Sequence, residues 1–540
     1  MATSGTVGPT EGAFDYIVVG AGSAGCAVAA RLSEDAGTRV LLLEAGPVDR
    51  NPWIHLPIGY YRTMFDPNVA WRFETAPESE LNGRQILWPR GKVLGGSSSI
   101  NGLVYIRGQA EDYDHWRQLG NRGWSFDDVL PYFMRAEQQE AGASDLHGAD
   151  GELSVENLRQ RHELCDAFIA SAQSLGYPRN DDFNGAQQEG VGYYQLTTRR
   201  GRRCSTAVAY LRPVEKRPNL KIETNALATR ILLDGREATG VEYRSNGTAH
   251  QARARREVIL SGGAINSPQL LQLSGIGPGE RLKSQGIAVA HDLPGVGNNL
   301  QDHLQARVCY RCTRPITVND DARSLWRRGK MALEYALWRT GPMSIGAGQA
   351  GLFAKTRPEL ATPDVQYHFI LFSWEQAGTE PHPFPGFTTS VCQLRPESRG
   401  TVMIKSPDPA TPPSIKPNYL STETDRRTMV DGMKLARRIG EQMPLKGYVV
   451  NEHLPGPKAV TDEDILAFVR ETGSTIYHPT STCMMGSGPT HVVDEQLRVH
   501  GIGRLRVADC SIMPTVVSGN TNAGAIMIGE KASDMILAAA

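Results

Sequence analysis

Three glycines, in the order Gly20-Ala-Gly22-Ser-Ala-Gly25, separate a segment typical of a strand from a segment typical of a helix. Residues 14–19 are a short, mostly apolar run, which predicts a buried parallel strand. Residues 24–32 carry small and apolar residues at helical spacing, and residues 39–43 predict a second buried strand that ends at Glu44. Strand, helix and strand in this order form a βαβ unit, so the N-terminus predicts a Rossmann-like, dinucleotide-binding fold.

Each residue type in this fingerprint has a physical reason. The first glycine permits the tight turn, the second lets the backbone approach a pyrophosphate, and the third lets the helix pack closely on the sheet. The phosphates then lie against free N–H groups at the start of the helix. Glu44 is placed to accept hydrogen bonds from the adenosine ribose. The predicted cofactor contacts here are Gly20, Gly22, Ser23, Ala24, Gly25 and Glu44.

A second glycine- and serine-rich segment, residues 91–101 (Gly-Lys-Val-Leu-Gly-Gly-Ser-Ser-Ser-Ile-Asn), decides which dinucleotide is expected. The first fingerprint suits NAD(P) and FAD equally well. The second segment reads as an extended passage along the rest of a long cofactor, with glycines that avoid collisions and side chains that offer donors. Two such segments together favour FAD, and FAD favours a redox enzyme.

The predicted strands in the rest of the chain indicate two interleaved domains. The fold class is α/β in the dinucleotide domain and α+β for the protein as a whole. Residues 257–261 and 505–508 look like further strands of the dinucleotide sheet, although they lie far apart in the chain. Residues 365–372 alternate, with Val365 and every second residue on one side, as in a sheet that covers something on one face. We expect an FAD-binding domain built from 14–155, 216–306 and 462–540, and a substrate domain on an antiparallel sheet built from 156–215 and 307–461.

Composition excludes several other classes. The formal net charge of -1 provides no basic field for nucleic acid, and no apolar run is long enough to span a bilayer. The first twelve residues lack the features of a signal peptide. The eight cysteines are scattered, Cys309 and Cys312 are expected to be ordinary thiols, and no metal site is expected. These features predict a cytoplasmic protein. Peripheral association with the inner membrane is a second possibility, although we expect no basic amphipathic helix to anchor the protein there.

Three long motifs resemble signatures of the glucose–methanol–choline (GMC) oxidoreductase family: residues 91–101, 263–277 and 299–303. The likeness continues into the C-terminus, and the chain looks most like the bacterial choline-dehydrogenase-like branch. Ile100 stands where some members carry a histidine bonded to the flavin, so the resemblance implies non-covalent FAD. The further cofactor contacts that it implies are Trp71, Val93, Gly95, Asn101, Ala228, Asp509 and Asn520.

The resemblance also implies a catalytic pair, His478 in the segment 477–483 and Asn520 in 518–522, with Asn520 favoured over Asn522. Histidine suits removal of a hydroxyl proton because its ordinary pKa is near neutrality. An asparagine amide can hold the substrate oxygen while hydride passes to the flavin. The run 523–536 is expected to be a helix whose N-terminus stabilises negative charge. His303 and His147 are expected to make structural hydrogen bonds, and whether His368 lines the pocket is left open.

The predicted activity is therefore FAD-dependent oxidation of a primary alcohol to the aldehyde, with oxygen or a quinone or electron carrier as acceptor. A neutral aliphatic or aromatic alcohol is preferred over choline, whose cation calls for an aromatic cage with negative charge. The aromatic residues of 367–387 and Glu375 could serve either substrate. A flavin-containing hydroxynitrile lyase, a light-driven decarboxylase and a catalytically silent flavoprotein are the alternatives.

Overall fold

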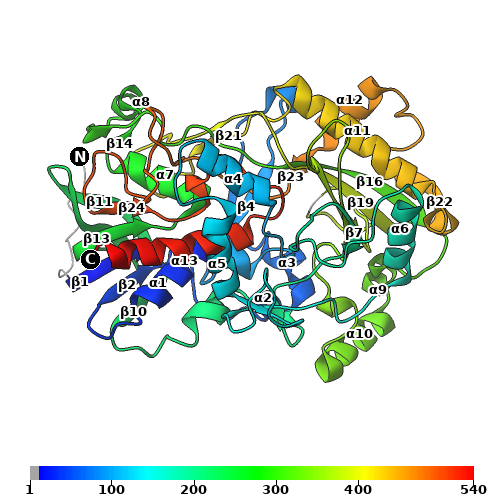
Figure 1. The fold of residues 1–540 in the computed structure, drawn as a ribbon, viewed down its shortest axis with the longest axis horizontal. Coiled ribbons are helices and arrows are strands. Elements are labelled where there is room, and N and C mark those ends of the chain that lie inside the picture. Colours follow the sequence, from blue (N-terminus) through cyan, green and yellow to red (C-terminus); the bar gives the residue numbers. More distant parts are fainter. Residues whose placement is uncertain (1–10, 377) are drawn as a thin grey trace.

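The computed structural model describes residues 11–376 and 378–540, so most of the N-terminal segment discussed above lies outside it. Two seven-stranded sheets lie at opposite ends of an elongated molecule, with the site described below between them (Figure 1). Both sheets draw strands from distant parts of the chain. The boundaries predicted for the two domains stay predictions.

The first sheet is mainly parallel, as the βαβ pattern predicts. Parallel pairing joins β10, β2, β1, β13 and β24, and antiparallel pairing adds β12 and β11. Every residue of β2 is buried, which explains its continuous apolar sequence. The strands are β1 (Glu11–Val19), β2 (Val40–Leu43), β10 (Leu220–Glu223), β11 (Ala226–Asp234), β12 (Glu237–Ser245), β13 (Thr248–Leu260) and β24 (Leu505–Val507).

The second sheet is entirely antiparallel, as predicted for the substrate domain. Its strands run in the order β22-β16-β19-β18-β17-β7, and β23 pairs with β16. They are β7 (Gly190–Tyr193), β16 (Leu304–Cys312), β17 (Ala350–Ala354), β18 (Val365–Ile370), β19 (Gly386–Gln393), β22 (Val449–Leu454) and β23 (Ser474–Thr475). Because β23 lies within 462–540, part of that predicted FAD-binding segment packs with the second sheet.

Helices cover both sheets. The predicted helix 523–536 is α13 (Asn522–Ala538), which packs on α1 (Ser23–Leu32) and α5 (Phe126–Ala136). The other long helices, α6 (Glu163–Ser174), α11 (Glu423–Gly440) and α12 (Asp462–Thr472), belong to the second end (Figure 1). The remaining α-helices are α2 (Pro52–His55), α3 (Tyr60–Thr63), α4 (Ala110–Gln118), α7 (Gly263–Leu273), α8 (Gly279–Ser284), α9 (Val318–Arg323) and α10 (Leu325–Trp338).

Short two-stranded sheets complete the chain. Their strands are β3 (Ala70–Glu74), β4 (Leu87–Gly91), β5 (Glu137–Gln139), β6 (Leu153–Val155), β8 (Thr198–Arg199), β9 (Arg202–Arg203), β14 (Ile276–Gly277), β15 (His291–Asp292), β20 (Thr401–Met403) and β21 (Ser414–Lys416). Within the described residues, none of the helices has the length and apolarity that crossing a bilayer requires.

The alternating segment 365–372 is shorter as a strand than predicted, since β18 ends at Ile370, and all six of its side chains are buried. The Tyr367 hydroxyl donates to the carbonyl of Gly432 in α11 at 2.8 Å, so Val365, Tyr367 and Phe369 pack under that helix. His368 and Ile370 lie on the other face and line a cavity. The strand therefore separates the core of the second end from the candidate site.

Candidate active site

The glycine fingerprint lies at the wall of a cleft of about 1140 Å³ along the carboxyl edge of the first sheet. Gly20 has φ +102°, and a Cβ there would lie 2.5 Å from the Ser261 carbonyl oxygen. A Cβ on Gly25 would lie 1.9 Å from the Gly20 carbonyl oxygen. A side chain at Gly25 would push α1 away from the end of β1, which is the close packing that the sequence predicted, and one at Gly20 would collide with the backbone that follows β13. The predicted cofactor residues that line this cleft are Gly20, Gly22, Ser23, Ala24, Glu44, Trp71, Ala228 and Asp509.

Glu44 lies at the end of β2, where its carboxylate closes the glycine turn. Its Oε2 accepts the Ala21 N–H at 3.0 Å and its Oε1 accepts the Gly46 N–H at 2.8 Å. Burial raises the pKa of this carboxyl to about 7. A carboxylate that already holds two backbone amides is rigidly placed to accept a further hydrogen bond from a ribose hydroxyl in the cleft.

Asp509 follows β24 and ties two distant segments together. Its Oδ2 accepts the Gly263 N–H at 2.8 Å and the Ser267 hydroxyl at 2.6 Å, while its Oδ1 accepts the Ser511 N–H at 2.8 Å. Burial raises the pKa of this carboxyl. The family-like segment that begins at Gly263 is thereby held against the C-terminal part of the chain.

Three of the predicted cofactor residues line neither this cleft nor the second cavity described below. Gly25 is the helix-packing glycine described above. Val93 is fully buried in a small apolar cluster that includes Ile100. Gly95 has φ +87°, and its N–H donates to the Ala21 carbonyl at 2.8 Å. The side chain of Val93 and the backbone of Gly95 therefore support the cleft wall.

The second cavity, of about 1220 Å³, shares Ser23, Arg90 and Ser97 with the cleft and continues it toward the second sheet. Asn101, His478 and Asn520 line this cavity. His368 lines it as well, and the Nδ1 of His368 has no hydrogen-bond partner among the described residues. Because His368 lies on the face of β18 that borders the cavity, it does line the pocket, which the sequence alone left open.

The two cavities together fit FAD. At the start of α1 the N-cap residue, Gly22, makes no side-chain cap, so the first amides of that helix are available to phosphates. At the start of α13 the N-cap residue, Thr521, also makes no side-chain cap, and it lines the second cavity. Glu44 lines the cleft at the end of β2. Ile100 lines the second cavity with an aliphatic side chain that cannot bond to a flavin.

His478 and Asn520 meet in the second cavity, although they come from separate loops. The Nδ2 of Asn520 lies 3.2 Å from the Nε2 of His478. Gln366 on β18 orients the asparagine, because its Nε2 donates to the Asn520 Oδ1 at 3.2 Å. The amide of Asn520 therefore turns its NH₂ toward the histidine.

His303 and His478 form a chain of hydrogen bonds that assigns their protons. The Nε2 of His303 lies 2.9 Å from the Leu394 carbonyl oxygen, so this nitrogen carries a hydrogen. The Nδ1 of neutral His303 is then an acceptor, and it lies 3.0 Å from the Nδ1 of His478. His478 must donate there, which leaves the lone pair of its Nε2 directed toward Asn520 and the cavity. This assignment follows from the network of partners.

Both histidines are neutral near pH 7. Burial, followed by repulsion from His303, His368 and Arg90 when these groups carry a proton, holds the pKa of His478 well below its ordinary value. Burial lowers the pKa of His303 to about 4. The Nε2 lone pair of neutral His478, which faces the Asn520 NH₂ in this structure, can accept a proton from a hydroxyl group that takes the place of that contact.

Asp302 fixes the backbone at His478. Its Oδ1 accepts the His478 N–H at 2.7 Å, and its Oδ2 accepts the hydroxyls of Thr475, at 2.6 Å, and Tyr419. Burial raises the pKa of Asp302 to about 6. The preceding residue, Tyr477, has φ +70°, an uncommon conformation for a bulky residue. Sequence reasoning quoted the segment 299–303 but gave Asp302 no role, since its partners lie more than a hundred residues away.

The aromatic residues proposed for the substrate pocket are mostly placed elsewhere. Tyr367, Phe369 and Phe387 belong to the core of the second end, because they face α11 or its neighbours. Among the aromatic residues of 367–387, Trp374 lines the cavity. Arg307, which sequence reasoning missed, lines it too and places its guanidinium 4.7 Å from the ring centre of Trp374.

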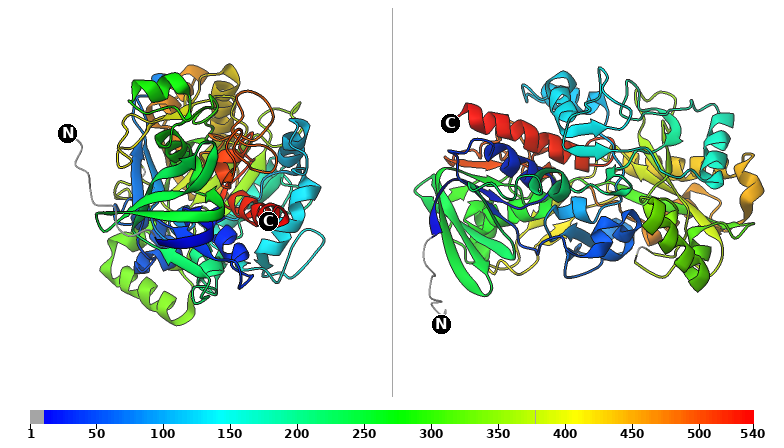
Figure 2. Two further views of the ribbon diagram at one scale, coloured as in Figure 1. Left: turned by 90° about the vertical axis from the view of Figure 1, so that its left-hand side faces the viewer. Right: turned by 90° about the horizontal axis from the view of Figure 1, so that it is seen from below.

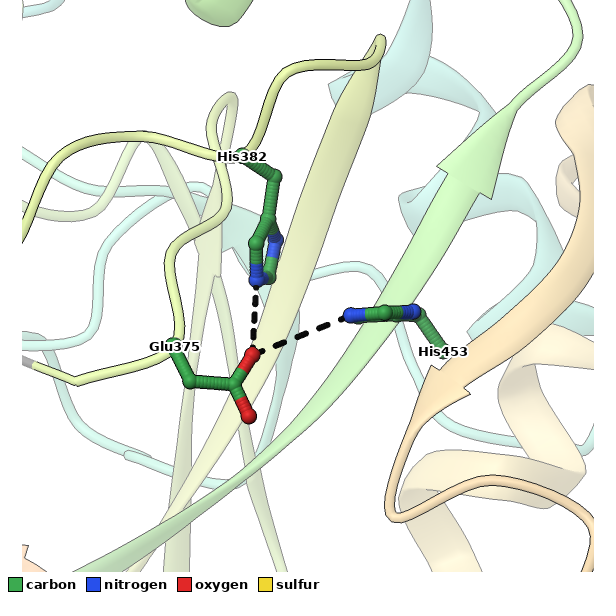
Figure 3. A group of neighbouring side chains, drawn as sticks. All are labelled: Glu375, His382 and His453. Carbon is green, nitrogen blue, oxygen red and sulfur yellow. Dashed lines mark hydrogen bonds and ion pairs between the residues drawn. The ribbon is translucent and has the colours of Figure 1, made fainter.

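Glu375 also lies outside the cavity, between His382 and His453 (Figure 3). Its Oε2 lies 3.0 Å from the Nε2 of His382 and 3.8 Å from the Nε2 of His453. The three ligand atoms are near enough to hold a metal ion. The carboxylate pairing, and the stacking of Phe384 on His382 with ring centres 4.8 Å apart, account for the group without one. The carboxylate of Glu375 is thus directed at the two histidines and does not line the cavity.

Comparison with known proteins identifies relatives along the whole chain. Two family models, both described as GMC oxidoreductase, match residues 14–305 and 396–529. The mitochondrial choline dehydrogenase of Homo sapiens is 46% identical over 99% of this chain and 91% of its own length. The alcohol dehydrogenase (acceptor) of Pseudomonas putida is 45% identical over 97% of this chain and 96% of its own length.

Solved structures show the same similarity. The crystal structure of pyridoxine 4-oxidase from Mesorbium loti superposes with a TM-score of 0.88 at 30% identity, covering 96% of this chain and 98% of that one. A formate oxidase superposes with a TM-score of 0.91 at 27% identity, covering 98% of this chain and 99% of that one.

Proposed function

Because this chain belongs to the GMC oxidoreductase family, we propose that it oxidises a neutral primary alcohol to the aldehyde with His478 as the base. The chain is an FAD-dependent oxidoreductase that acts on CH–OH donors, and it binds FAD non-covalently. FAD supplies the hydride acceptor. The observation that carries the roles of the residues is the His303–His478–Asn520 chain, which fixes the hydrogen of His478 on Nδ1 and places the lone pair of its Nε2 beside the Asn520 NH₂ in the cavity.

His478 takes the hydroxyl proton at Nε2, the nitrogen that does not contact His303. Asn520 holds the alcohol oxygen through its NH₂ group, and Gln366 prevents that amide from turning over. The free N–H groups at the start of α13 stabilise negative charge that develops beside them. A positioned base contributes about 10²–10⁴-fold to such a reaction.

The charge of the cavity supports a neutral substrate. Its described lining residues include no aspartate or glutamate but do include Arg90 and Arg307. Arg90 is engaged, since its Nη1 donates to the Tyr477 carbonyl at 2.7 Å. The Nε of Arg307 has no partner among the described residues. A quaternary ammonium group in this cavity would meet uncompensated positive charge.

A second candidate is choline oxidation. The similarity to the human mitochondrial choline dehydrogenase, at 46% identity, favours it. Trp374, Tyr60 and Tyr477 in the cavity wall offer aromatic faces to a cation. The ratio of kcat/KM for choline to kcat/KM for benzyl and aliphatic alcohols separates the two candidates, and a ratio well above one would favour choline.

We assign the electrons to a quinone or carrier protein, with oxygen as the alternative acceptor. The name of the Pseudomonas putida relative, an alcohol dehydrogenase (acceptor), supports this assignment. A cytoplasmic location is supported by the eight cysteines, all unpaired, Cys309 and Cys312 included.

The test is anaerobic mixing of the yellow, FAD-loaded protein with primary alcohols while the visible absorbance of the flavin is followed. Bleaching by a neutral alcohol supports the proposal, and the speed of recovery in air separates an oxidase from a dehydrogenase. Turnover of a hydroxynitrile with a flavin that stays oxidised would favour the lyase instead. Absence of bleaching by aliphatic, aromatic, furanic and choline-like alcohols would contradict alcohol oxidation.

A further inference from the structure

Helix α10 exposes large apolar side chains to a degree that is unusual for a surface helix. Of its fourteen residues only Tyr335 is buried. The helix stands out from the body of the molecule at the edge of the second end (Figure 1, Figure 2). Its exposed apolar side chains, with the exposed fraction of each residue, are Leu325 81%, Trp326 81%, Leu333 60%, Leu337 59% and Trp338 63%.

Three of these side chains, Trp326, Leu333 and Leu337, form a stripe on the face that points away from the protein. At about 100° per residue, Trp326, Leu333 and Leu337 fall within about 40° of one another on the helix. Tyr335 lies about 180° from Trp326, and its hydroxyl donates to the Gly201 carbonyl at 2.9 Å. The helix is therefore attached along one side and presents the apolar stripe outward. In a helix that simply covers a core, the apolar stripe faces inward.

Basic residues accompany the apolar stripe. Residues 325–339 contain Arg327, Arg328, Lys330 and Arg339 against one acidic residue, Glu334. Arg327 lies 3.6 Å from Asp321, whereas Arg328 and Lys330 have no ion pair within the described part of the chain. Lys330 lies about 40° from Trp326, at the border of the stripe, where its charge can reach past the apolar side chains. The surface thus combines apolar and positively charged groups.

We propose that α10 docks this protein on the surface of a lipid bilayer that carries acidic headgroups. Leucine and tryptophan side chains enter the boundary between headgroups and acyl chains, and the basic residues contact lipid phosphates. Trp326, on the outward stripe near the start of the helix, anchors it in the interface. The helix lies on the membrane and does not cross it. The proposal departs from the expectation that no basic amphipathic helix anchors the protein, because the outward direction of this stripe depends on tertiary packing and is not visible in the sequence.

The position of α10 places the docking surface close to the wall of the reaction cavity. α10 packs on the 3-10 turn Pro342–Ser344, which packs on the turn Pro57–Gly59. The next residue, Tyr60, lines the reaction cavity. Docking through α10 brings this side of the cavity wall near the bilayer, where a lipid-dissolved alcohol or electron acceptor would be concentrated.

The test is co-sedimentation of the FAD-loaded enzyme with vesicles. One set consists of phosphatidylcholine alone and the other of equal parts of phosphatidylcholine and phosphatidylglycerol. We expect binding to the acidic vesicles that weakens with added salt, and a lower affinity for the neutral ones. The triple variant Trp326→Ser, Leu333→Ser, Leu337→Ser should bind acidic vesicles at least about tenfold more weakly. Arg328→Glu with Lys330→Glu should abolish the preference for acidic lipid.

The control is Met443→Ser with Val460→Ser, which removes exposed apolar side chains (65% and 74% exposed) outside α10 and should bind like the parent protein. Alcohol oxidation with a soluble dye as acceptor should be equal in all variants, since none of these residues lines the cavity. Failure of the parent protein to bind either vesicle, or equal binding by the triple variant, would overturn the proposal. So would a dimer in solution that the triple variant dissociates, because a second copy would then be the occupant of the stripe.

Discussion

The Nδ1 atoms of His303 and His478 lie 3.0 Å apart, and this contact determines which nitrogen of His478 is free to accept a proton. His303 is held as an acceptor by the bond from its own Nε2 to the Leu394 carbonyl. His478 therefore keeps its hydrogen on Nδ1 and faces the cavity with a lone pair. The contact makes His303 a positioning residue, and it goes beyond the structural role that its sequence motif indicated.

The first prediction concerns the base itself. His478→Ala removes the proton acceptor while leaving the cleft around Glu44 intact. We expect flavin reduction by alcohol to slow by about 10²–10⁴-fold with FAD still bound, as measured by anaerobic stopped flow and by the visible spectrum. His115→Ala, a histidine outside both cavities, is the matched control. A His478→Ala protein that reduces its flavin at the parent rate would place the base elsewhere.

The second prediction concerns His303. His303→Phe keeps a ring of similar size but leaves the buried N–H of His478 without an acceptor. Loss of a buried partner costs about 1–3 kcal/mol, so the rate constant of flavin reduction should fall roughly tenfold or more. A merely structural role would lower stability alone. The decisive readout is a change in the pH profile of flavin reduction in a variant that keeps its Tm within a few degrees of the parent protein.

The third prediction is a pH dependence. His478 must be neutral to act as a base, and burial holds its pKa well below the ordinary value. Lowering the pH toward that depressed pKa protonates the base and slows the reaction, whereas raising the pH leaves the base as it is. The rate constant of flavin reduction should therefore be flat from about pH 6.5 upward. An acid limb centred on the ordinary histidine pKa would show that His478 is not desolvated as the structure indicates.

The fourth prediction concerns substrate charge. Arg307→Met removes a cation from the cavity wall and keeps an apolar contact with Trp374. The ratio of kcat/KM for choline to kcat/KM for benzyl alcohol should rise, by roughly tenfold if the guanidinium acts at about 6 Å with an effective dielectric constant near 40. Arg311→Met, on the same strand but outside the cavity, is the control. An unchanged ratio would mean that Arg307 does not face the bound alcohol.

The fifth prediction concerns retention of the cofactor. Glu44→Ala leaves the N–H groups of Ala21 and Gly46 without their acceptor and removes the proposed ribose contact. We expect the Kd of FAD to rise by about tenfold or more, measured by flavin fluorescence during dilution. Because Ile100 cannot bond to the flavin, acid precipitation should release all of the yellow colour from both proteins. Equal FAD affinity in the two proteins would remove Glu44 from the ribose site.

Much of the fold could be predicted from sequence because its signals are local. The strand at 14–19, the turn at Gly20 and the helix that follows depend on spacing and on backbone freedom within a few residues, and the structure has β1 and α1 there. The helix predicted at 523–536 is α13 for the same reason. The pattern of 365–372 predicted a strand, but not which side faces the cavity, since an alternating pattern looks the same from either side.

Sequence alone was enough for the dinucleotide cleft, the antiparallel second sheet and the pairing of His478 with Asn520 through family resemblance. Only the tertiary structure decided the proton positions, because His303 and His478 are 175 residues apart and their tautomers depend on Leu394 from a third segment. It also decided that Tyr367 belongs to the core, that Arg307 enters the cavity, and that the apolar stripe of α10 faces outward. Each of these depends on which surface packing covers, and that choice is made between segments distant in the chain.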